Sequence, residues 1–475
     1  MPFTNGFYIN GHWQLEDAQR SFVPLINPAT EDVLYQVPMA TKAEVNAAID
    51  AAHKAFTSYS QSPVAERIAL VERIGAAYKE RLDDIAFAIS TEMGAPITLA
   101  QKAQAPLGLG QIESALEAAR NFTFEEAKEG YRLHHEAAGV AALITPWNWP
   151  MNQALCKIAP ALLAGCTMVF KPSELAPLSA VLLTEIIAAA TPPKGVFNMI
   201  FGQGEIVGPL LSSDPRIDVV SLTGSNRAGT SVLHESAASV KRVSLELGGK
   251  SANILLPDCN FEQAVNSSVR AVMNNSGQSC NAPTRLLVPK ERLNEVEEVA
   301  KHACTTLAMG APSDPNTRLG PIANQRQYER VKYYIELGIE EGAQLLVGGT
   351  TKPTHLPKGY YVAPTLFSQV SNQMRIAQEE IFGPVLCIIP YQSVEEAIRI
   401  ANDSIYGLSA YVYGQDMAAA QQVARQLRAG NVHINNARAQ LSAPFGGYKQ
   451  SGIGREWGEY GLLEFLEQKA IFSPV

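Results

Sequence analysis

The sequence predicts an α/β protein built on mainly parallel β-sheets. From residue 139 onward, short apolar or β-branched runs alternate with stretches of helix length, which is the pattern of βαβ units. A second alternating pattern lies between residues 251 and 445. The 475 residues are enough for two or three domains, each with its own core. The predicted strands are 139–145, 167–170, 196–201, 219–223 and 242–245 in the first pattern, and 252–256, 285–288, 385–389, 410–412 and 431–434 in the second.

Helices are predicted between these strands and ahead of them. Apolar residues recur at helical spacing in 261–273, where Phe261, Val265 and Val272 would share one face. The first 120 residues are expected to be mostly helical, and the polar stretch 131–136 breaks that pattern. The other predicted helices are 42–56, 65–82, 151–164, 179–190, 204–212, 226–236, 290–307 and 394–402.

Composition excludes several classes of protein. Apolar residues make up 46% and charged residues 18% of the chain, which is typical of a globular protein and not of a disordered one. The net charge of −8 and the lack of a basic run argue against nucleic acid and anionic membranes as partners. Six scattered cysteines favour a reducing compartment over a disulfide framework. With no signal segment and no apolar run of about 18 residues, a cytoplasmic protein is expected.

One acid and one thiol stand out as candidates for chemistry. Glu246 lies in LELGGK, and Cys280 follows it in GQSC. A thiolate is a strong nucleophile, and a carboxylate that reaches the same carbon can activate water. Most lone cysteines are small buried hydrophobes, and Cys156, Cys166, Cys304 and Cys387 lie in apolar runs of that kind, with Cys259 undecided. The small, polar loop around Cys280 favours a reactive thiol instead.

Polar residues follow several of the predicted strands, where the ligands of parallel sheets bind. Asn148 follows the first strand, and its amide could donate a hydrogen bond or simply make a turn. Lys171 and Glu174 follow the second, where they could hold a ribose or begin a helix. The segment from Gly224 and Ser225 opens a helix after the fourth, which suits a pyrophosphate. Together they indicate a dinucleotide site beside Glu246.

The motifs PWNWP, KPSE, LTGS, LELGGK, GQSC, EEIFGP and PFGGYKQSGIGRE occur in the order and spacing of the aldehyde dehydrogenase superfamily. The chain resembles that family from about residue 8 to residue 472. The resemblance implies a Rossmann-like parallel-sheet cofactor domain, an α/β catalytic domain and a small β oligomerisation element. The corresponding boundaries are 1–119 and 139–248 for the dinucleotide-binding domain, 249–448 for the catalytic domain, and 120–138 with 449–475 for the oligomerisation element.

The resemblance also implies a reaction, NAD(P)-dependent oxidation of a small-molecule aldehyde to a carboxylic acid. Cys280 would attack the aldehyde, the amide of Asn148 would hold the oxyanion, and Glu246 would activate the water that hydrolyses the thioester. NAD is expected, with NADP as the alternative, because Glu174 would repel a 2′-phosphate; no metal is expected. A homodimer or homotetramer is implied. The cofactor-binding residues would be Trp147, Lys171, Ser173, Glu174, Gly204, Gly224, Ser225, Gly229, Leu247, Glu380 and Phe382.

The positions that match the family's aldehyde tunnel are mostly small or polar. Relatives that act on betaine aldehyde surround its quaternary ammonium with aromatic faces, whereas this chain keeps only Trp149 and Phe445. The tunnel is therefore expected to be roomy and polar, for a substrate that carries hydrogen-bonding groups. The tunnel residues predicted in this way are Trp149, Asn152, Gln153, Cys156, Asn274, Ser279, Asn281, Ala439 and Phe445.

Three alternatives remain beside this interpretation. A CoA-acylating aldehyde dehydrogenase would release the acyl group to CoA, but such relatives lack an acid at the position of Glu246. A thiol esterase without a redox step would need only Glu246 and Cys280, and would leave the cofactor contacts without a use. A structural protein on the same fold would not need the complete set of Asn148, Glu246 and Cys280.

Overall fold

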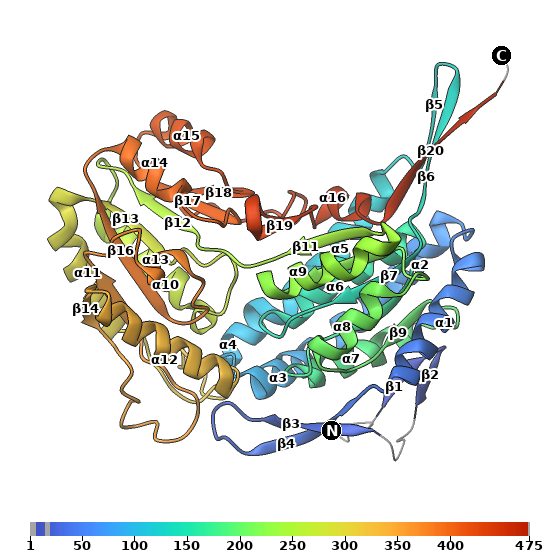
Figure 1. Cartoon of the computed structure of the whole chain (residues 1–475), viewed down its shortest axis with the longest axis horizontal. Helices are drawn as coiled ribbons and strands as arrows, with labels where there is room; N and C mark the ends of the chain where they lie inside the picture. Colours follow the sequence, from blue (N-terminus) through green and yellow to red (C-terminus); the bar gives the residue numbers. More distant parts are fainter. Residues whose placement is uncertain (1–5, 15–19, 474–475) are drawn as a thin grey trace.

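The computed structural model describes residues 6–14 and 20–473 of the chain. Two large β-sheets, each covered by helices, lie side by side, and a narrow β-arm projects from one of them near the C-terminus (Figure 1). The chain crosses from the first sheet to the second directly after β11 (Arg242–Glu246) and enters the second at β12 (Ala252–Leu255). This crossover holds the LELGGK motif, so Glu246 lies at the boundary between the two sheets.

The first sheet has eight strands in the order β19-β11-β10-β7-β8-β9-β1-β2, of which β7 to β11 are parallel. All five strands of the predicted first pattern are confirmed: β7 (Val140–Ile144), β8 (Thr167–Lys171), β9 (Phe197–Met199), β10 (Val219–Thr223) and β11. The helices predicted between them are confirmed as α6 (Pro150–Ala164), α7 (Pro177–Ala189), α8 (Gly204–Ser213) and α9 (Asn226–Ser236).

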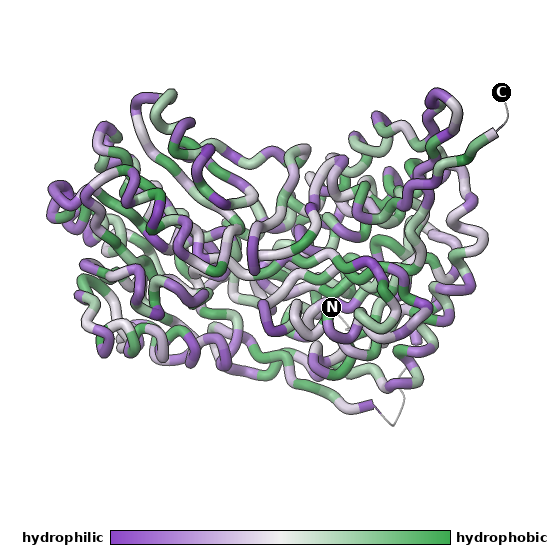
Figure 2. The backbone as a smooth tube through the Cα atoms, turned by 45° about the horizontal axis from the view of Figure 1, so that its top comes forward, coloured by the Kyte–Doolittle hydropathy of each residue, from purple (hydrophilic) through white to green (hydrophobic). Residues whose placement is uncertain are grey.

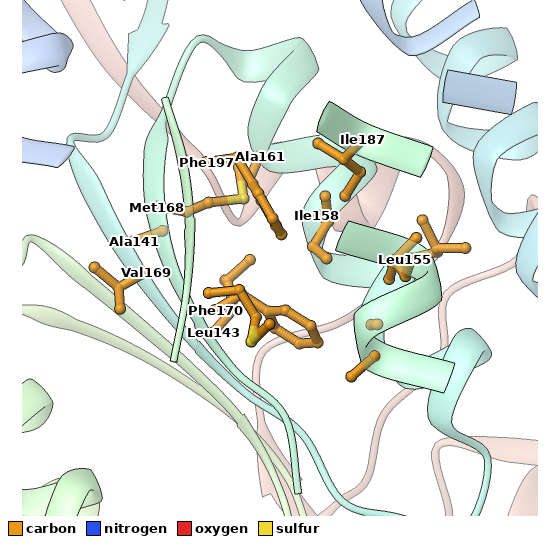
Figure 3. Packing of buried hydrophobic residues seen from close by; sticks show 14 of the residues in the cluster. Ala141, Leu143, Leu155, Ile158, Ala161, Met168, Val169, Phe170, Ile187 and Phe197 are labelled. Carbon is orange, nitrogen blue, oxygen red and sulfur yellow. The ribbon is translucent and has the colours of Figure 1, made fainter. Parts of the chain in front are cut away.

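Apolar side chains join this sheet to its helices. Met168 and Phe170 of β8 face Leu155 and Ile158 of α6, and Ile187 of α7 lies beside them (Figure 3). Hydrophilic residues occur mainly toward the outside of the molecule (Figure 2), and strands β7, β8 and β10 are buried along their whole length. Helices α6 and α7 pack with α2 (Val64–Glu80), α3 (Leu82–Met93) and α5 (Ala105–Asn121), while α1 (Lys42–Tyr59) packs with α8; short helical turns α4 (Ile97–Leu99) and η1 (Ala100–Gln104) link α3 to α5.

The second sheet has seven strands in the order β14-β15-β16-β13-β12-β17-β18 and is parallel except for β14. Its predicted strands are confirmed as β12, β13 (Arg285–Pro289), β16 (Val385–Tyr391), β17 (Ser409–Tyr413) and β18 (Asn431–Ile434), and β14 (Gln344–Val347) and β15 (Thr365–Ser368) are additional. Its helices are α10 (Phe261–Met273), α11 (Leu293–Thr305), α12 (Gln325–Glu340), α13 (Arg375–Gln378), α14 (Val394–Asn402) and α15 (Met417–Gln426).

The projecting arm is a three-stranded sheet in the order β20-β6-β5. The hairpin of β5 (Glu125–Lys128) and β6 (Tyr131–Ala137) pairs with β20 (Leu466–Phe472), where the polar stretch 131–136 broke the helical pattern. Residues 449–465 do not belong to this arm: β19 (Gly452–Ile453) pairs with β11 of the first sheet, and α16 (Gly458–Leu463) packs on α5 and α6. Here the structure differs from the predicted boundary at residue 449.

The N-terminal region also differs from the prediction of mostly helical structure. Strands β1 (Phe7–Ile9) and β2 (His12–Gln14) extend the first sheet, and β3 (Ser21–Ile26) pairs with β4 (Val33–Met39) in a separate ribbon. The predicted helices follow only from α1 onward. Within the described residues, no helix is long and apolar enough to cross a membrane.

Candidate active site

The loop that carries Cys280 follows α10, which Asn260 caps by accepting a hydrogen bond from the Gln263 amide at 3.0 Å. After α10 the backbone turns left-handed at Asn275, Ser276 and Gly277, with φ of 51°, 55° and 74°. A Cβ on Gly277 would lie 2.0 Å from the Gly383 carbonyl oxygen, so only glycine allows the two loops to pack backbone to backbone. Cys280 is partly exposed at the end of this loop, in contrast to the other five cysteines, all buried.

Asn148 is fixed to the same loop. Its side-chain Nδ2 donates to the Gln278 carbonyl oxygen at 3.0 Å, and its own carbonyl oxygen accepts from Asn275 Nδ2 at 2.9 Å. A further amide, Gln104 Nε2, donates to Asn275 Oδ1 at 3.0 Å and holds that side chain in place. The second N–H of Asn148 makes no hydrogen bond to the protein in the described part of the chain, so it remains able to donate to a ligand oxygen.

Glu246 ends β11 and is buried, with 3% of its surface exposed. Neither carboxylate oxygen has a hydrogen-bond partner among the described residues. Burial, followed by the charge of Glu456, raises the pKa of Glu246 well above its ordinary value. The carboxylate lies against Gly446, where a Cβ would come within 2.6 Å of Oε1. A glycine at this place therefore leaves room for the acid.

Cys280 and Glu246 are close enough for their charges to interact. Burial is the largest cause that raises the pKa of the Cys280 thiol, and the charges of Glu380 and Glu246 add to it. The crossover also touches the thiol's own residue, since a Cβ on Gly249 would lie 2.4 Å from the Cys280 carbonyl oxygen. The fold thus brings the predicted acid and thiol into one partly buried space, with Asn148 fixed to the loop that carries the thiol.

A buried ion pair behind Glu246 was missing from the sequence-based prediction. Lys157 of α6 contacts Glu456, and their side chains are 0% and 5% exposed. Cys156 Sγ donates to Glu456 Oε2 at 3.2 Å, so this predicted tunnel residue directs its thiol toward the ion pair. Burial is the largest single cause and lowers the pKa of Lys157, but the charge and hydrogen bond of Glu456, together with the charges of Cys156 and Glu246, outweigh it and raise the pKa. The one feature of the sequence that could have indicated this ion pair is Glu456 itself, the acidic residue that ends the glycine-rich motif.

The predicted adenosine and pyrophosphate contacts lie at the carboxyl ends of β8 and β10. Lys171 is buried, and its Nζ donates to Glu174 Oε2 at 3.3 Å and to the Pro172 carbonyl oxygen at 3.1 Å. Ser225 caps α9 by accepting from the Ala228 amide at 3.3 Å. Beside it, Thr223 Oγ1 is buried with no hydrogen-bond partner among the described residues. An unpaired hydroxyl next to a helix N-terminus fits the pyrophosphate of a dinucleotide.

The glycines of this region have two different surroundings. A Cβ on Gly229 would lie 2.7 Å from the Leu247 side chain, so the small residue lets α9 approach the crossover. Gly204, at the start of α8, has no heavy atom within 4 Å of such a Cβ and faces open space. Ser173 Oγ accepts from the Leu175 amide at 3.2 Å and shapes the loop before α7.

The predicted nicotinamide contacts meet the crossover from the other sheet. Glu380 Oε1 accepts from the Gly249 amide at 3.1 Å, and burial raises the pKa of Glu380 to about 7. Phe382 has φ of 62°, and its ring meets the Trp147 ring edge to face at 5.6 Å and 87°. Of these residues, Glu380 is close enough to Cys280 for its charge to raise the pKa of the thiol.

Several predicted tunnel residues make polar or aromatic contacts, among them Ser279, which precedes Cys280 in the chain. Trp149 Nε1 donates to Ser279 Oγ at 2.8 Å. The buried Asn152 Oδ1 accepts from Gln111 Nε2 at 2.8 Å, so α5 also contributes to this region, which the sequence motifs did not indicate. Phe445 stacks on Trp457, with ring centroids 4.4 Å apart and planes at 19°.

The remaining predicted tunnel residues are less closely grouped. Asn274 is exposed and borders a surface cavity of about 510 Å³ with Arg270 and Asn436. Ala439 is exposed, and Gln153 is buried in α6. The Asn281 carbonyl oxygen accepts from Tyr411 Oη at 3.0 Å, which fixes the backbone just after the thiol.

Two parallel-sheet domains with a thiol, an acid and an amide at their boundary define a class of enzymes that attack a carbonyl with cysteine. The chain belongs to the aldehyde dehydrogenase family, whose model matches residues 13–471. It is 52% identical to 3-succinoylsemialdehyde-pyridine dehydrogenase of a Pseudomonas species, with 98% of each chain covered.

Solved structures agree with this assignment. A mutant of aldehyde dehydrogenase C from Pseudomonas syringae, in complex with NAD+ and octanal, is 47% identical, has a TM-score of 0.98 and covers 100% of this chain and 98% of its own. Betaine aldehyde dehydrogenase from Staphylococcus aureus, in complex with NAD+, is 34% identical with a TM-score of 0.96, and the match covers 99% and 94% of the two chains. The prediction of an aldehyde dehydrogenase fold and activity is confirmed.

Proposed function

We propose that this enzyme oxidises an aldehyde to a carboxylic acid with NAD, through a covalent intermediate on Cys280 that water hydrolyses. The observation that carries the proposal is the convergence of Asn148, Glu246 and Cys280 at the boundary of the two sheets. The presence of Glu246 favours water over CoA as the group that releases the acid from Cys280. The residues suited to a dinucleotide, Lys171, Glu174 and Ser225, favour a dehydrogenase over an esterase without a redox step.

Each of the three residues has a distinct part. The Cys280 thiol, whose pKa is raised, first gives its proton to a base, for which Glu246 is the nearby carboxylate, and Glu246 releases this proton before the hydrolysis step. Cys280 then adds to the aldehyde carbon as the thiolate, which forms a carbon–sulfur bond and places negative charge on the aldehyde oxygen. The free N–H of Asn148, a buried residue, then donates to that oxygen. Glu246 takes a proton from the water that attacks the thioester, and its raised pKa makes the ionised carboxylate a stronger base.

NAD accepts the hydride of the aldehyde carbon when it is bound. Lys171 and Glu174 would hold the adenine ribose, Ser225 the pyrophosphate, and Glu380 the nicotinamide ribose. The pair of Lys171 and Glu174 is already formed at 3.3 Å, which orients the carboxylate before the cofactor arrives. The NAD+ complexes of the two solved relatives support the choice of NAD, with NADP kept as the alternative.

The substrate is proposed to be a semialdehyde that carries a flat ring and hydrogen-bond acceptors. Support comes from the aromatic pair Phe445 and Trp457, from the buried amide of Asn152, and from Ser279, which precedes the thiol in the chain. The buried Nε1 of Trp457 has no partner in the described chain and would donate to a carbonyl or ring nitrogen. The name of the 52% identical relative describes a semialdehyde joined to a pyridine.

A steady-state assay of NADH formation tests both the proposed reaction and the proposed substrate class. The expected ranking of kcat/KM places 3-succinoylsemialdehyde-pyridine above octanal, and octanal above betaine aldehyde, with no requirement for CoA. Oxidation that depends on CoA would replace the hydrolytic mechanism, and ester cleavage without NADH formation from any aldehyde would replace the redox function. A preference for octanal would leave the reaction intact and refute only the substrate class.

A homo-oligomer in the cytoplasm is the remaining part of the proposal. The arm strand β20 carries Ile471 and Phe472, which are 44% and 76% exposed, and β18 is an unpaired edge of the second sheet. Exposed edges of this kind pair readily with another strand, so a dimer or tetramer is expected. The six free thiols fit a reducing compartment. Light scattering of the purified chain measures the oligomeric state, and a monomer at micromolar concentration would contradict it.

A further inference from the structure

A small polar cavity lies beside the crossover, on the side of the second sheet. It encloses about 20 Å³, and the deeply buried part of its polar wall includes Lys250, Ser251, Arg285 and Ser409, beside Asn402, Tyr406 and Arg428. The first four are 1% to 3% exposed. None of the four takes part in the chemistry described above, although Lys250 and Ser251 directly follow the glycines that touch Cys280 and Glu380.

Three hydrogen-bond donors of this wall have no partner in the protein. They are Lys250 Nζ, Ser251 Oγ and Ser409 Oγ, and each is buried without a hydrogen bond to any described residue. A buried donor left unpaired costs about 1–3 kcal/mol, and more when it is charged. Three such donors around one space indicate that the space holds a ligand that accepts hydrogen bonds.

The charge of the wall is also unbalanced. Arg285 donates through Nε to the Lys250 carbonyl oxygen at 2.9 Å and through Nη2 to the Ala401 carbonyl oxygen at 2.9 Å. Its Nη1 bonds are to Asn372 Oδ1 and the Ile400 carbonyl oxygen, so no bond reaches a carboxylate. No ion pair of either cation occurs in the described part of the chain. Glu380 acts on Lys250 and Asp403 on Arg285 only through their charge, without a salt bridge, so an anion in the cavity would add direct compensation for two buried cations.

We propose that this cavity is a binding site for one small monovalent anion of halide size. The volume of about 20 Å³ is near that needed for a single water molecule and is too small for phosphate or sulfate. Arg428 is exposed at the rim of the cavity and adds positive charge along the entry. The anion accepts from Lys250, Ser251 and Ser409 together, and so joins the crossover to β17 of the second sheet.

The consequence is a halide-dependent stability of the whole enzyme. An anion that binds only the folded chain raises the ratio of folded to unfolded protein by about elevenfold at ten times its Kd. Burial lowers the pKa of Lys250 to about 8, and a bound anion would favour the charged ammonium and raise that pKa. The effect saturates with chloride, in contrast to general effects of salt on the surface.

The test compares thermal unfolding in sodium chloride and sodium gluconate at equal ionic strength, since gluconate is too large for the cavity. The parent enzyme is expected to melt at a higher temperature in chloride, with a saturating dependence on chloride concentration. Ser409→Ala should reduce the shift and Lys250→Met should abolish it. Ser212→Ala is the matched control, because Ser212 Oγ is equally buried and unpaired but lies on α8 of the other domain.

Crystals grown in bromide supply the direct view, with an anomalous peak expected among Lys250, Ser251 and Ser409. Equal melting temperatures in chloride and gluconate would overturn the proposal, and so would a chloride shift in Ser409→Ala as large as in the parent. A cavity without an anomalous peak in bromide would assign the space to water alone. If Lys250→Met does not fold, the comparison of Ser409→Ala with Ser212→Ala still decides the outcome.

Discussion

Replacing Asn148 by alanine separates catalysis from stability. Asn148 Nδ2 makes one hydrogen bond to the protein, at 3.0 Å to the Gln278 carbonyl oxygen. That oxygen also accepts from Asn275 Nδ2 at 3.2 Å, so the loop before Cys280 keeps an anchor in the variant. The expected loss of folding free energy is therefore small, about 1 kcal/mol for one hydrogen bond.

The expected loss of activity is much larger. If the second N–H of Asn148 holds the developing oxyanion, its removal slows acylation by about 10²–10³-fold, which is roughly 3–4 kcal/mol of transition-state stabilisation. Stopped-flow measurement of the first turnover of NADH formation gives this rate directly, and urea unfolding gives the stability. A loss of transition-state stabilisation that is clearly larger than the loss of unfolding free energy identifies Asn148 as a catalytic donor.

Asn253→Ala provides a matched control for this prediction. Asn253 is also a buried asparagine, and its Nδ2 makes one hydrogen bond, to Ser268 Oγ at 2.7 Å. It should lose a similar amount of stability and retain nearly all of the first-turnover rate. A decrease of less than about threefold in Asn148→Ala, set against the expected penalty, would make Asn148 a structural turn residue and refute the oxyanion role.

Three further substitutions test other parts of the account. Cys280→Ala should abolish aldehyde oxidation and leave the Kd of NAD nearly unchanged in calorimetry; residual turnover above a mock preparation would refute the covalent step. Glu174→Gln should lower kcat/KM for NAD and raise it for NADP, and equal changes for both cofactors would remove Glu174 from cofactor choice. Glu456→Gln should cost about 3–5 kcal/mol of stability, because it leaves Lys157 as an unpaired buried cation. Glu205→Gln breaks an exposed pair and should unfold like the parent; a similar loss in both variants would contradict the role of burial.

Local sequence patterns predicted the helices and strands that are fixed by local chemistry. The predicted bounds of 226–236 and 261–273 coincide with α9 and α10, where Ser225 and Asn260 cap the first turns. Strands β1 and β2 have three residues each and form a hairpin around Asn10-Gly11, a local turn signal that the sequence-based prediction did not use. The hairpin joins the first sheet through a distant pair, Tyr8 with Met199. Strand β19 has only two residues, and its partner β11 lies far back in the chain. The formation of β19 and the pairing of β1 with β9 rest on tertiary contacts that no local pattern contains.

The residues of the candidate site also fall into those that local motifs identified and those that only the fold brings together. The linear motifs identified Asn148, Glu246 and Cys280, because glycine-rich or proline-rich loops surround each of them. The motifs did not identify Lys157, which lies in the apolar helix α6 and resembles an ordinary core position. Its partner Glu456 is 299 residues further along the chain, so only the fold brings the two charges together behind Glu246.

The most direct test of the central claim is the time course of NADH formation by Glu246→Gln. An amide cannot take a proton from water, so hydrolysis of the thioester on Cys280 should become slower than its formation. The account predicts a burst of about one NADH per active site, followed by a slow steady rate. Turnover at the parent rate without a burst would contradict the assignment of Glu246 as the base that activates water.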